Sequence, residues 1–448
     1  MKNLFLSTST VALILGGSAA FAQSNEAYLE QTGSALQSSQ TQSGNVNIST
    51  VVQTGIDAQA ELIQAGSENN STVIQTGGVS RSVVGQTGDR NTYTANTGDN
   101  SWVRGVEQTG NDNTAEIYVV GNGGHWTTDL IQRGNANLSF ASFTGGQSTN
   151  SYRLIQTGDR NDYSVTADGS GGNFEQYATQ NDVGNSQDNV ATAMSVGDGQ
   201  RSFQRLLGNF NNSTINLSGS SNNAQHWIGY GYTGVSSFNT FTITQAGTGD
   251  YAYTNLQEGD FNIATIDQSD AGNVGNIAVQ RMEGDTNVAL MTQAGTSNRA
   301  NSWQTGNLNN VNQAQTGDSN ISRSTQTGNS NISVQTQLVS LNIADLIQEG
   351  DENSATLTQN GSSNEATQGQ YGNLNILTST QLGSTSVYEV VQDGLANNMT
   401  LSQIGVGLIA SATQTGNNNV GTQTQMGANN YASLIQTGDN NIATQIQN

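Results

Sequence analysis

Primary amide side chains recur in this chain at a spacing that could stack them into hydrogen-bonded rows. From Gln293 onward a glutamine returns at every eleventh position, and an asparagine usually stands at the fifth position after it. A primary amide both donates and accepts hydrogen bonds, so identical amides placed one above another can bond along the stack. We therefore expect amide ladders. Their glutamine members are Gln293, Gln304, Gln315, Gln326, Gln337, Gln348, Gln359, Gln370, Gln381, Gln392, Gln403, Gln414, Gln425 and Gln436. Their asparagine members are Asn298, Asn309, Asn320, Asn331, Asn342, Asn353, Asn364, Asn375, Asn397, Asn419, Asn430 and Asn441.

A glycine at the second position after the glutamine completes the unit, with Val339 as the exception, and Ser386 and Leu408 replace the asparagine. Since side chains alternate along a strand and the repeat length is odd, simple alternation would put successive glutamines on opposite faces. The segment Gln-x-Gly-x-x-Asn must then be a turn that resets the alternation. Glycine supplies the positive φ that such a turn needs, and asparagine tolerates it next best. The predicted turn glycines are Gly295, Gly306, Gly317, Gly328, Gly350, Gly361, Gly372, Gly383, Gly394, Gly405, Gly416, Gly427 and Gly438.

The rest of each unit predicts an extended strand. In the unit from Gln337, the residues Asn342, Ala344, Leu346 and Gln348 fall on one side of such a strand. Two 11-residue arcs then make a 22-residue rung of two facing strands, and rungs stack with like side chains aligned. The predicted fold class is all-β: a two-strand-per-rung β-solenoid with cross-β, amyloid-like stacking. A right-handed helical coiled coil shares the 11-residue period, but a glycine in each unit would cost it about 1 kcal/mol.

The chain divides into four segments. Residues 1–22 read as a secretory signal peptide, with Lys2, an apolar stretch from Leu4 to Leu15 and a small-x-small end at Ala20-Phe21-Ala22. No later segment is a continuous apolar run long enough to span a membrane, so we expect no membrane insertion. The other segments are 23–96, with regular repeats, 97–292, with irregular and aromatic-richer repeats, and 293–448, with regular 11-residue repeats.

The middle section has a looser period. Gln108, Gln132, Gln156, Gln180 and Gln204 recur at every twenty-fourth position, which predicts slightly longer arcs with longer turns or bulges. This section also holds 19 of the 25 aromatic residues that follow residue 22. Two interpretations stay open. The aromatic side chains pack over the longer turns, or they form an exposed row that binds sugars or a neighbouring fibre.

The residues that catalysis or metal binding would need are sparse. There are two histidines, His125 and His226, and no cysteine, nucleophile motif or phosphate loop. We expect both histidines on exposed turns, and no catalytic site, metal or cofactor. Gly-Asp pairs such as those at Asp89 and Asp439 are expected to form turns and to slow premature stacking by their charge. Lys2 is the only lysine, so after residue 22 the chain has 11 arginines against 34 acidic residues, and such a surface repels nucleic acid and anionic membranes.

The repeating unit resembles the curlin repeat. The pattern Gln-x-Gly-x-x-Asn-x-Ala-x-x-x-Gln is kept from Gln425 to Gln436 and, with valine at the glycine position, from Gln337 to Gln348. The resemblance covers nearly all of the chain after the signal peptide, tightly at both ends and loosely in the centre, and this chain is unusually long for the family. It implies a major amyloid subunit of curli-like fibres, in which the ladder glutamines and asparagines hold the amyloid core.

The resemblance also implies partners and a location. The subunit would be secreted and would polymerise with itself, end to end, into an extracellular fibre on the cell surface for biofilm matrix and adhesion. An outer-membrane curli-type export pore and a nucleator subunit would be its partners. The alternative is a monomeric secreted β-solenoid adhesin or carbohydrate-binding module that presents threonine or aromatic rows.

Overall fold

The computed structural model describes residues 25–98, 101–120, 125–144, 150–168, 173–177, 187–229 and 236–448. These residues form 37 β-strands and the turns between them, with no helix. In this part of the chain there is accordingly no helix long and apolar enough to cross a membrane. The predicted signal peptide, residues 1–22, lies outside the described residues. The chain divides into two compact units at Phe210 and Asn211, and each unit is described by itself.

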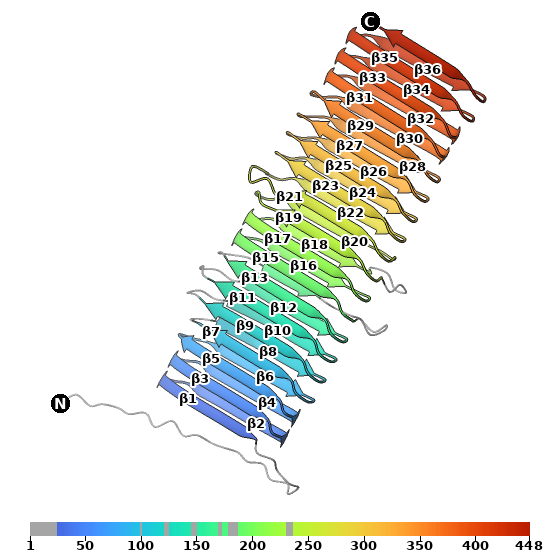
Figure 1. Cartoon of the computed structure of the whole chain (residues 1–448). Helices are drawn as coiled ribbons and strands as arrows, with labels where there is room; N and C mark the ends of the chain where they lie inside the picture. The colour runs from blue at the N-terminus through green and yellow to red at the C-terminus, as the bar shows by residue number, and fades with distance from the viewer. Residues whose placement is uncertain are drawn as a thin grey trace, which may run out of the picture. The chain divides into compact units, whose positions relative to one another are not determined.

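The first unit consists of two parallel sheets. Successive strands along the chain belong to alternate sheets (Figure 1). Each strand pairs with the strand two positions away along the chain. One sheet contains β1 (Glu26–Ser34), β3 (Ile48–Ile56), β5 (Asn70–Gly77), β7 (Thr92–Thr97), β9 (Thr114–Val120), β11 (Leu138–Thr144), β13 (Asp162–Asp168) and β15 (Val190–Asp198). The other contains β2 (Gln37–Asn45), β4 (Gln59–Ser67), β6 (Arg81–Thr87), β8 (Ser101–Thr109), β10 (His125–Arg133), β12 (Asn150–Thr157), β14 (Asn173–Tyr177) and β16 (Arg201–Leu206).

The second unit repeats this arrangement with parallel pairs of the same kind. Its odd-numbered strands are β17 (Asn212–Ser220), β19 (Thr240–Gln245), β21 (Ile263–Gln268), β23 (Val288–Ala294), β25 (Asn310–Thr316), β27 (Ile332–Leu338), β29 (Ser354–Asn360), β31 (Ile376–Ser384), β33 (Asn398–Val406), β35 (Val420–Ala428) and β37 (Ile442–Gln447). Its even-numbered strands are β18 (Asn223–Ile228), β20 (Tyr251–Leu256), β22 (Ile277–Glu283), β24 (Arg299–Thr305), β26 (Ile321–Thr327), β28 (Ile343–Glu349), β30 (Glu365–Asn373), β32 (Val387–Leu395), β34 (Ile409–Thr415) and β36 (Tyr431–Thr437).

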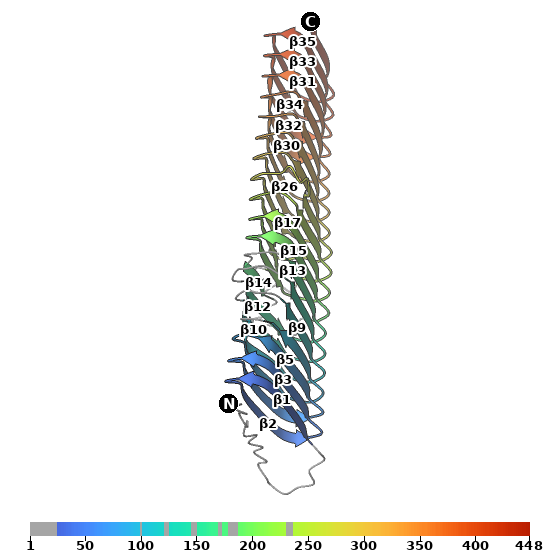
Figure 2. The same ribbon diagram turned by 90° about the vertical axis from the view of Figure 1, so that its left-hand side faces the viewer.

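Successive coils are in register. Gln381 of β31 lies opposite Gln403 of β33, and Gly383 lies opposite Gly405, so one coil corresponds to the predicted 22-residue rung. Figure 2 shows β31, β33 and β35 stacked on one another in this way. The predicted all-β solenoid with two strands in each rung is confirmed.

The interior between the two sheets is narrow and partly polar. Along β29, buried and outward side chains alternate, and Ala355, Leu357 and Gln359 are buried. Ala355 and Leu357 belong to an apolar cluster of small and medium side chains in the second unit. Because only 33% of the residues are apolar, buried polar side chains must also hold the coils together.

The turns reset the alternation with two residues of positive φ. Gly394 and Gly416 have φ of 127° and 113°, as predicted for the glycine position. The second such residue directly precedes the ladder asparagine: Ala396 has φ of 55° and Asn418 has φ of 53°. The ladder asparagine itself does not have a positive φ, although asparagine tolerates one better than most residues. That asparagine directly precedes the next strand, and its side chain binds along the stack.

The middle section departs from the regular rung length. Between β10 and β12 the register shifts at Thr127 and Asp129, a bulge of the expected kind. Between β13 and β15 the coil lengthens, since Asp162 lies opposite Val190 and Asn161 bonds to Asn189 in the same 28-residue step. The division between the two units, at Phe210, falls inside this section.

The predicted row of glutamines at every twenty-fourth position is only partly correct. Gln108, Gln132 and Gln156 lie opposite one another. Gln204 does not continue the row, because it lies opposite Gln176, which in turn lies opposite Leu154, two positions before Gln156. The longer coil length between β12 and β16 changes the phase. Gln180 lies outside the described residues.

Candidate functional site: glutamine and asparagine ladders

Each sheet of the second unit carries one glutamine ladder. In both ladders, Nε2 of a glutamine donates to Oε1 of the glutamine one coil later, at 2.7–3.3 Å. From Gln293 onward, the ladder on the odd-numbered strands consists of Gln293, Gln315, Gln337, Gln359, Gln381, Gln403, Gln425 and Gln447. Before Gln293 the same row includes Gln245 and Gln268. The ladder on the even-numbered strands consists of Gln304, Gln326, Gln348, Gln370, Gln392, Gln414 and Gln436. The structure thus places every predicted ladder glutamine in one of two files.

The second amide proton of these glutamines reaches the facing sheet. Nε2 of Gln348 in β28 donates to the carbonyl oxygen of Ile332, the first residue of β27, at 2.9 Å. Nε2 of Gln392 in β32 donates in the same way to Ile376 of β31, also at 2.9 Å. Each glutamine therefore joins its own coil to the next one and one sheet to the other. Both glutamines are fully buried, where an unpaired amide group would cost about 1–3 kcal/mol.

The asparagine ladders bind main-chain groups of the next coil. Oδ1 of Asn331 accepts the backbone N–H of Asn353 at 3.0 Å, and Nδ2 of Asn331 donates to the carbonyl oxygen of Gly350 at 2.7 Å. The backbone N–H to Oδ1 bond recurs at 3.0–3.1 Å along both files. The turns after even-numbered strands carry Asn309, Asn331, Asn353, Asn375, Asn397, Asn419 and Asn441. The turns after odd-numbered strands carry Asn298, Asn320, Asn342 and Asn364.

The second file is interrupted after Asn364. Oδ1 of Asn364 accepts the N–H of Ser386 at 3.1 Å, and Oγ of Ser386 accepts the N–H of Leu408 at 3.4 Å. Leu408 has no side-chain acceptor for the next coil. Asn430, the next member, donates to the carbonyl oxygen of Met426 within its own turn at 2.6 Å. The structure therefore does not join Asn430 to the other predicted ladder asparagines.

The predicted turn glycines are needed for two physical reasons. All 13 have φ between 97° and 145°, a region that other residues rarely adopt. Their backbones also approach closely between coils: a Cβ on Gly394 would lie 2.0 Å from the carbonyl oxygen of Gly416. Val339 takes a φ of 79° at the same position in the turn, although it is β-branched.

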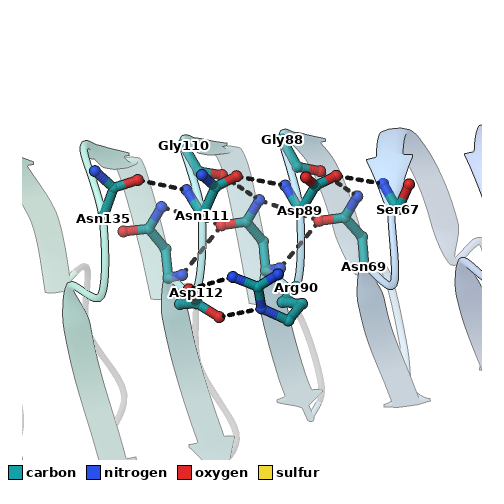
Figure 3. Close-up of polar contacts among 11 residues, drawn as sticks. Ser67, Asn69, Gly88, Asp89, Arg90, Gly110, Asn111, Asp112 and Asn135 are labelled. Atoms are coloured by element: carbon teal, nitrogen blue, oxygen red, sulfur yellow. Dashed lines mark hydrogen bonds and ion pairs between the residues drawn. The ribbon is translucent and has the colours of Figure 1, made fainter.

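The structure also contains a file of side chains that the sequence pattern did not predict, on the turn residue three positions after the glutamine. In the first unit the N–H of Ser67 donates to Oδ1 of Asp89 at 2.8 Å, the N–H of Asp89 to Asn111 at 2.9 Å, and the N–H of Asn111 to Asn135 at 3.0 Å (Figure 3). In the second unit the N–H of Asn417 donates to Oδ1 of Asp439 at 2.8 Å. The available signal was the fixed position of Asp or Asn after the turn glycine.

An exposed ion pair lies beside this file. The guanidinium of Arg90 binds the carboxylate of Asp112 one coil away, with an N–O distance of 2.6 Å (Figure 3). Its hydrogen bond from Arg90 lowers the pKa of Asp112 below the usual value. Because both side chains are about half exposed, we expect a small contribution to stability.

His226 is part of the core. It lies in β18 with full burial, and its Nδ1 is 2.6 Å from Oγ of Ser213 in β17. Burial lowers the pKa of His226 to about 3, so the ring is neutral. The expectation of an exposed turn histidine is wrong for His226, because its position in β18 is an inward one. His125 begins β10. Among the described residues, no three His, Cys, Asp or Glu side chains are grouped to hold a metal ion.

Comparison with known proteins identifies one family. Residues 342–383 match the family model of the curlin associated repeat. This stretch contains β28, β29 and β30 and the ladder positions Gln348, Gln359, Gln370 and Gln381. No curated protein matches the sequence. The resemblance of this chain to the curlin-repeat family is confirmed by the match at residues 342–383.

Proposed function

We propose that this protein is a structural subunit that assembles end to end into extracellular, curli-like amyloid fibres. The observation that carries the proposal is the glutamine ladder, which continues without interruption from Gln304 to Gln436. Each coil binds the next through identical groups, so an end coil presents the groups that bind another coil. Unpaired strand edges of this kind readily pair with another chain. The curlin associated repeat at residues 342–383 supports the same proposal.

The proposed role is structural rather than catalytic. Among the described residues, Ser213 and His226 lie within hydrogen-bond distance of each other, but both are fully buried in the core, out of reach of a substrate. We propose that residues 1–22 direct export, that a curli-type outer-membrane pore completes it, and that a nucleator starts the fibre. The fibre would remain on the cell surface and serve biofilm matrix and adhesion.

Polymerisation kinetics test this proposal. Residues 23–448, which include all described strands, are expected to show a lag followed by growth of thioflavin T fluorescence, and preformed fibres should remove the lag. A folded polar domain fused to each end should stop growth, since it covers both edges. Equal rates for the capped and uncapped chains would make end-to-end assembly wrong. A chain that stays monomeric when seeded would make the fibre proposal wrong.

One observation favours the alternative of a monomeric carbohydrate-binding or adhesin module. Phe238 and Phe261 stack on adjacent turns of the second unit, with ring centroids 4.9 Å apart and planes 4° from parallel. Both side chains are about half exposed. Retention of the monomer on a polysaccharide column, lost in Phe261→Ala, would support this function. Equal retention of the two forms would remove it.

A further inference from the structure

The last two strands of the second unit form a step. Strand β37 follows β36 along the spiral, and the two belong to opposite sheets. Among the described residues, β36 pairs with β34 alone and β37 with β35 alone. Since each sheet advances by about 4.8 Å per coil, β36 lies about half that distance below β37 along the direction in which the coils stack. The first two strands of the first unit form the matching step, with β1 paired to β3 and β2 to β4.

The glutamine ladders have a direction. Nε2 of Gln436 donates one proton to the carbonyl oxygen of Val420 at 3.0 Å, which fixes the amide, and its Oε1 accepts from Gln414. The other amide proton of Gln436 therefore points toward a next coil. Nε2 of Gln42 donates to Gln64 at 2.8 Å, so Oε1 of Gln42 faces away from the solenoid. The β36 end offers amide donors, and the β1 end offers amide oxygens.

The hydrogen bonds at the asparagine positions run in the opposite direction to those of the glutamine ladders. The β1 end and the β36 end are therefore complementary for both kinds of hydrogen bond. Backbone N–H groups donate toward the N-terminal side, as Asn47 donates to Oδ1 of Asn25 at 2.9 Å. At the other end, Asn441 donates its own N–H to Asn419 at 3.0 Å and presents its Oδ1 to the next coil. Two identical ends would place donors against donors. Association of one end with the other is thus the arrangement that satisfies both kinds of group.

We propose that a second copy of this chain continues the same spiral, with its β1 stacked on β36 and its β2 stacked on β37. This inference rests on the proposed fibre function and adds the register of the contact. Gln31 of the second copy then lies over Gln436, and Gln42 lies over Gln447, so both glutamine ladders pass from copy to copy. On the outward faces of the sheets, Glu30 lies over Ile435 and Thr41 lies over Ile446, because each of these residues directly precedes a ladder glutamine.

The competing register stacks β1 of the second copy on β37. It would bring β2 over β36 with one strand missing between them, because β2 begins half a coil above β1. The free backbone groups of β36 would then stay unpaired, at a cost that the continuous spiral avoids. Exposure marks the same edge: Ile435 is 73% exposed, whereas Ile347, in the same row inside the unit, is 40% exposed.

Engineered disulfides separate the two registers, and the chain is well suited because it has no cysteine. Paired residues of adjacent strands lie about 4.8 Å apart at Cα, within the range for a disulfide. Ile435 and Ile446 lie on opposite sheets, so one partner cannot reach both. The three double variants are Glu30→Cys with Ile435→Cys, Thr41→Cys with Ile446→Cys, and Glu30→Cys with Ile446→Cys. The single variants Ile435→Cys and Ile446→Cys serve as controls.

The expected result, after fibres form and are mildly oxidised, is conversion of monomer to covalent multimers in the first two double variants. The third should remain monomeric on a non-reducing gel. Multimers in the third variant, without multimers in the first two, would overturn the register while leaving the fibre function intact. Dimers from either single variant would show contact between identical ends and overturn the proposal. Failure of the unmodified chain to form fibres would overturn the proposed function, and the register with it.

Discussion

A buried glutamine amide carries two N–H donors and one carbonyl oxygen, and the ladder gives each of them a partner. Gln370 shows the arrangement: its Nε2 donates to Gln392 at 2.9 Å and to the carbonyl oxygen of Ser354 at 3.0 Å, and its Oε1 accepts from Gln348 at 2.7 Å. An asparagine at this position would be too short to span the same distance. The chain therefore uses glutamine at the end of the strand and asparagine in the turn.

At the residue scale, Asp250 gives a pH-dependent prediction. It occupies an asparagine position, where its N–H donates to Asn222 and its Oδ1 accepts from Asn276. Its Oδ2 is buried without a partner among the described residues, whereas Nδ2 of Asn276 donates to the carbonyl oxygen of Gly295. Burial raises the pKa of Asp250 to about 6 from its ordinary value of 3.8.

The sign of the effect follows from that raised pKa. Well below pH 3.8 the carboxyl is protonated in both the folded and the unfolded chain, and stability is lost as the pH rises from about 3.8 through 6. Asp250→Asn should therefore stabilise the second unit by about 2–3 kcal/mol at pH 7.5 and by little at pH 4, as measured by urea unfolding. Asp318→Asn, at an exposed turn position, is the control. An equal gain for Asp250→Asn at both pH values would contradict the assignment.

Val339 gives a second prediction at this scale. It is a β-branched residue with a φ of 79°, in the position that glycine otherwise fills. Such backbone strain costs about 1–3 kcal/mol, part of which the greater freedom of glycine in the unfolded chain offsets. Val339→Gly should raise the free energy of unfolding by about 1 kcal/mol. The same exchange in strand β27, Val334→Gly, should lower it. A loss of stability in both variants would show that Val339 is not strained.

At the element scale, the sequence predicts the positions of strand and turn correctly where the 11-residue spacing of the repeating unit is kept. Each regular strand could be placed because Gln, Gly and Asn recur together, as from Gln425 to Asn430. The second positive φ of the turn could not be predicted, since Leu308, Glu352 and Ala396 all occupy that position and share no preference for it. The position, rather than the residue type, imposes the conformation, because a coil above and a coil below hold the turn in place.

The irregular arcs show the same limit. Gln204 has the expected residue type and spacing but lies opposite Gln176, because the coil between these two is longer than the coil from Gln132 to Gln156. His226 has a residue type that suggests an exposed turn, yet the alternation within β18 places it inward. In both cases the register set by the neighbouring coils decides the position, and the register depends on turn lengths that a single sequence does not specify.

A prediction at this scale concerns the link between strands. Gln370→Leu keeps the side-chain size but removes three hydrogen bonds, and it leaves Gln348 and Gln392 with unpaired amide groups. We expect a loss of about 2–4 kcal/mol in the free energy of unfolding, measured by urea titration. Thr367→Val, on the outward face of the same strand, should change it by less than about 0.5 kcal/mol. Equal effects of the two substitutions would contradict a role for the ladder in stability.

At the scale of the whole molecule, both units use the same chemistry. In the first unit, Gln64, Gln86, Gln108, Gln132 and Gln156 form a ladder with Nε2–Oε1 distances of 2.8 Å, as in the second unit. A solenoid built this way gains stability coil by coil through contacts between neighbours. Adding another copy of the chain at an end forms the same contacts again, which is the physical basis of the proposed fibre.

Diffraction from aligned fibres of residues 23–448 is the measurement that tests this account most directly. Ladders that run along the fibre axis predict a strong meridional reflection at about 4.7–4.8 Å, since that is the spacing between stacked strands. Gln370→Leu fibres, where they form, should give the same reflection after slower growth. A reflection at this spacing on the equator, with strands parallel to the fibre axis, would contradict the account. So would a seeded chain that remains monomeric in solution.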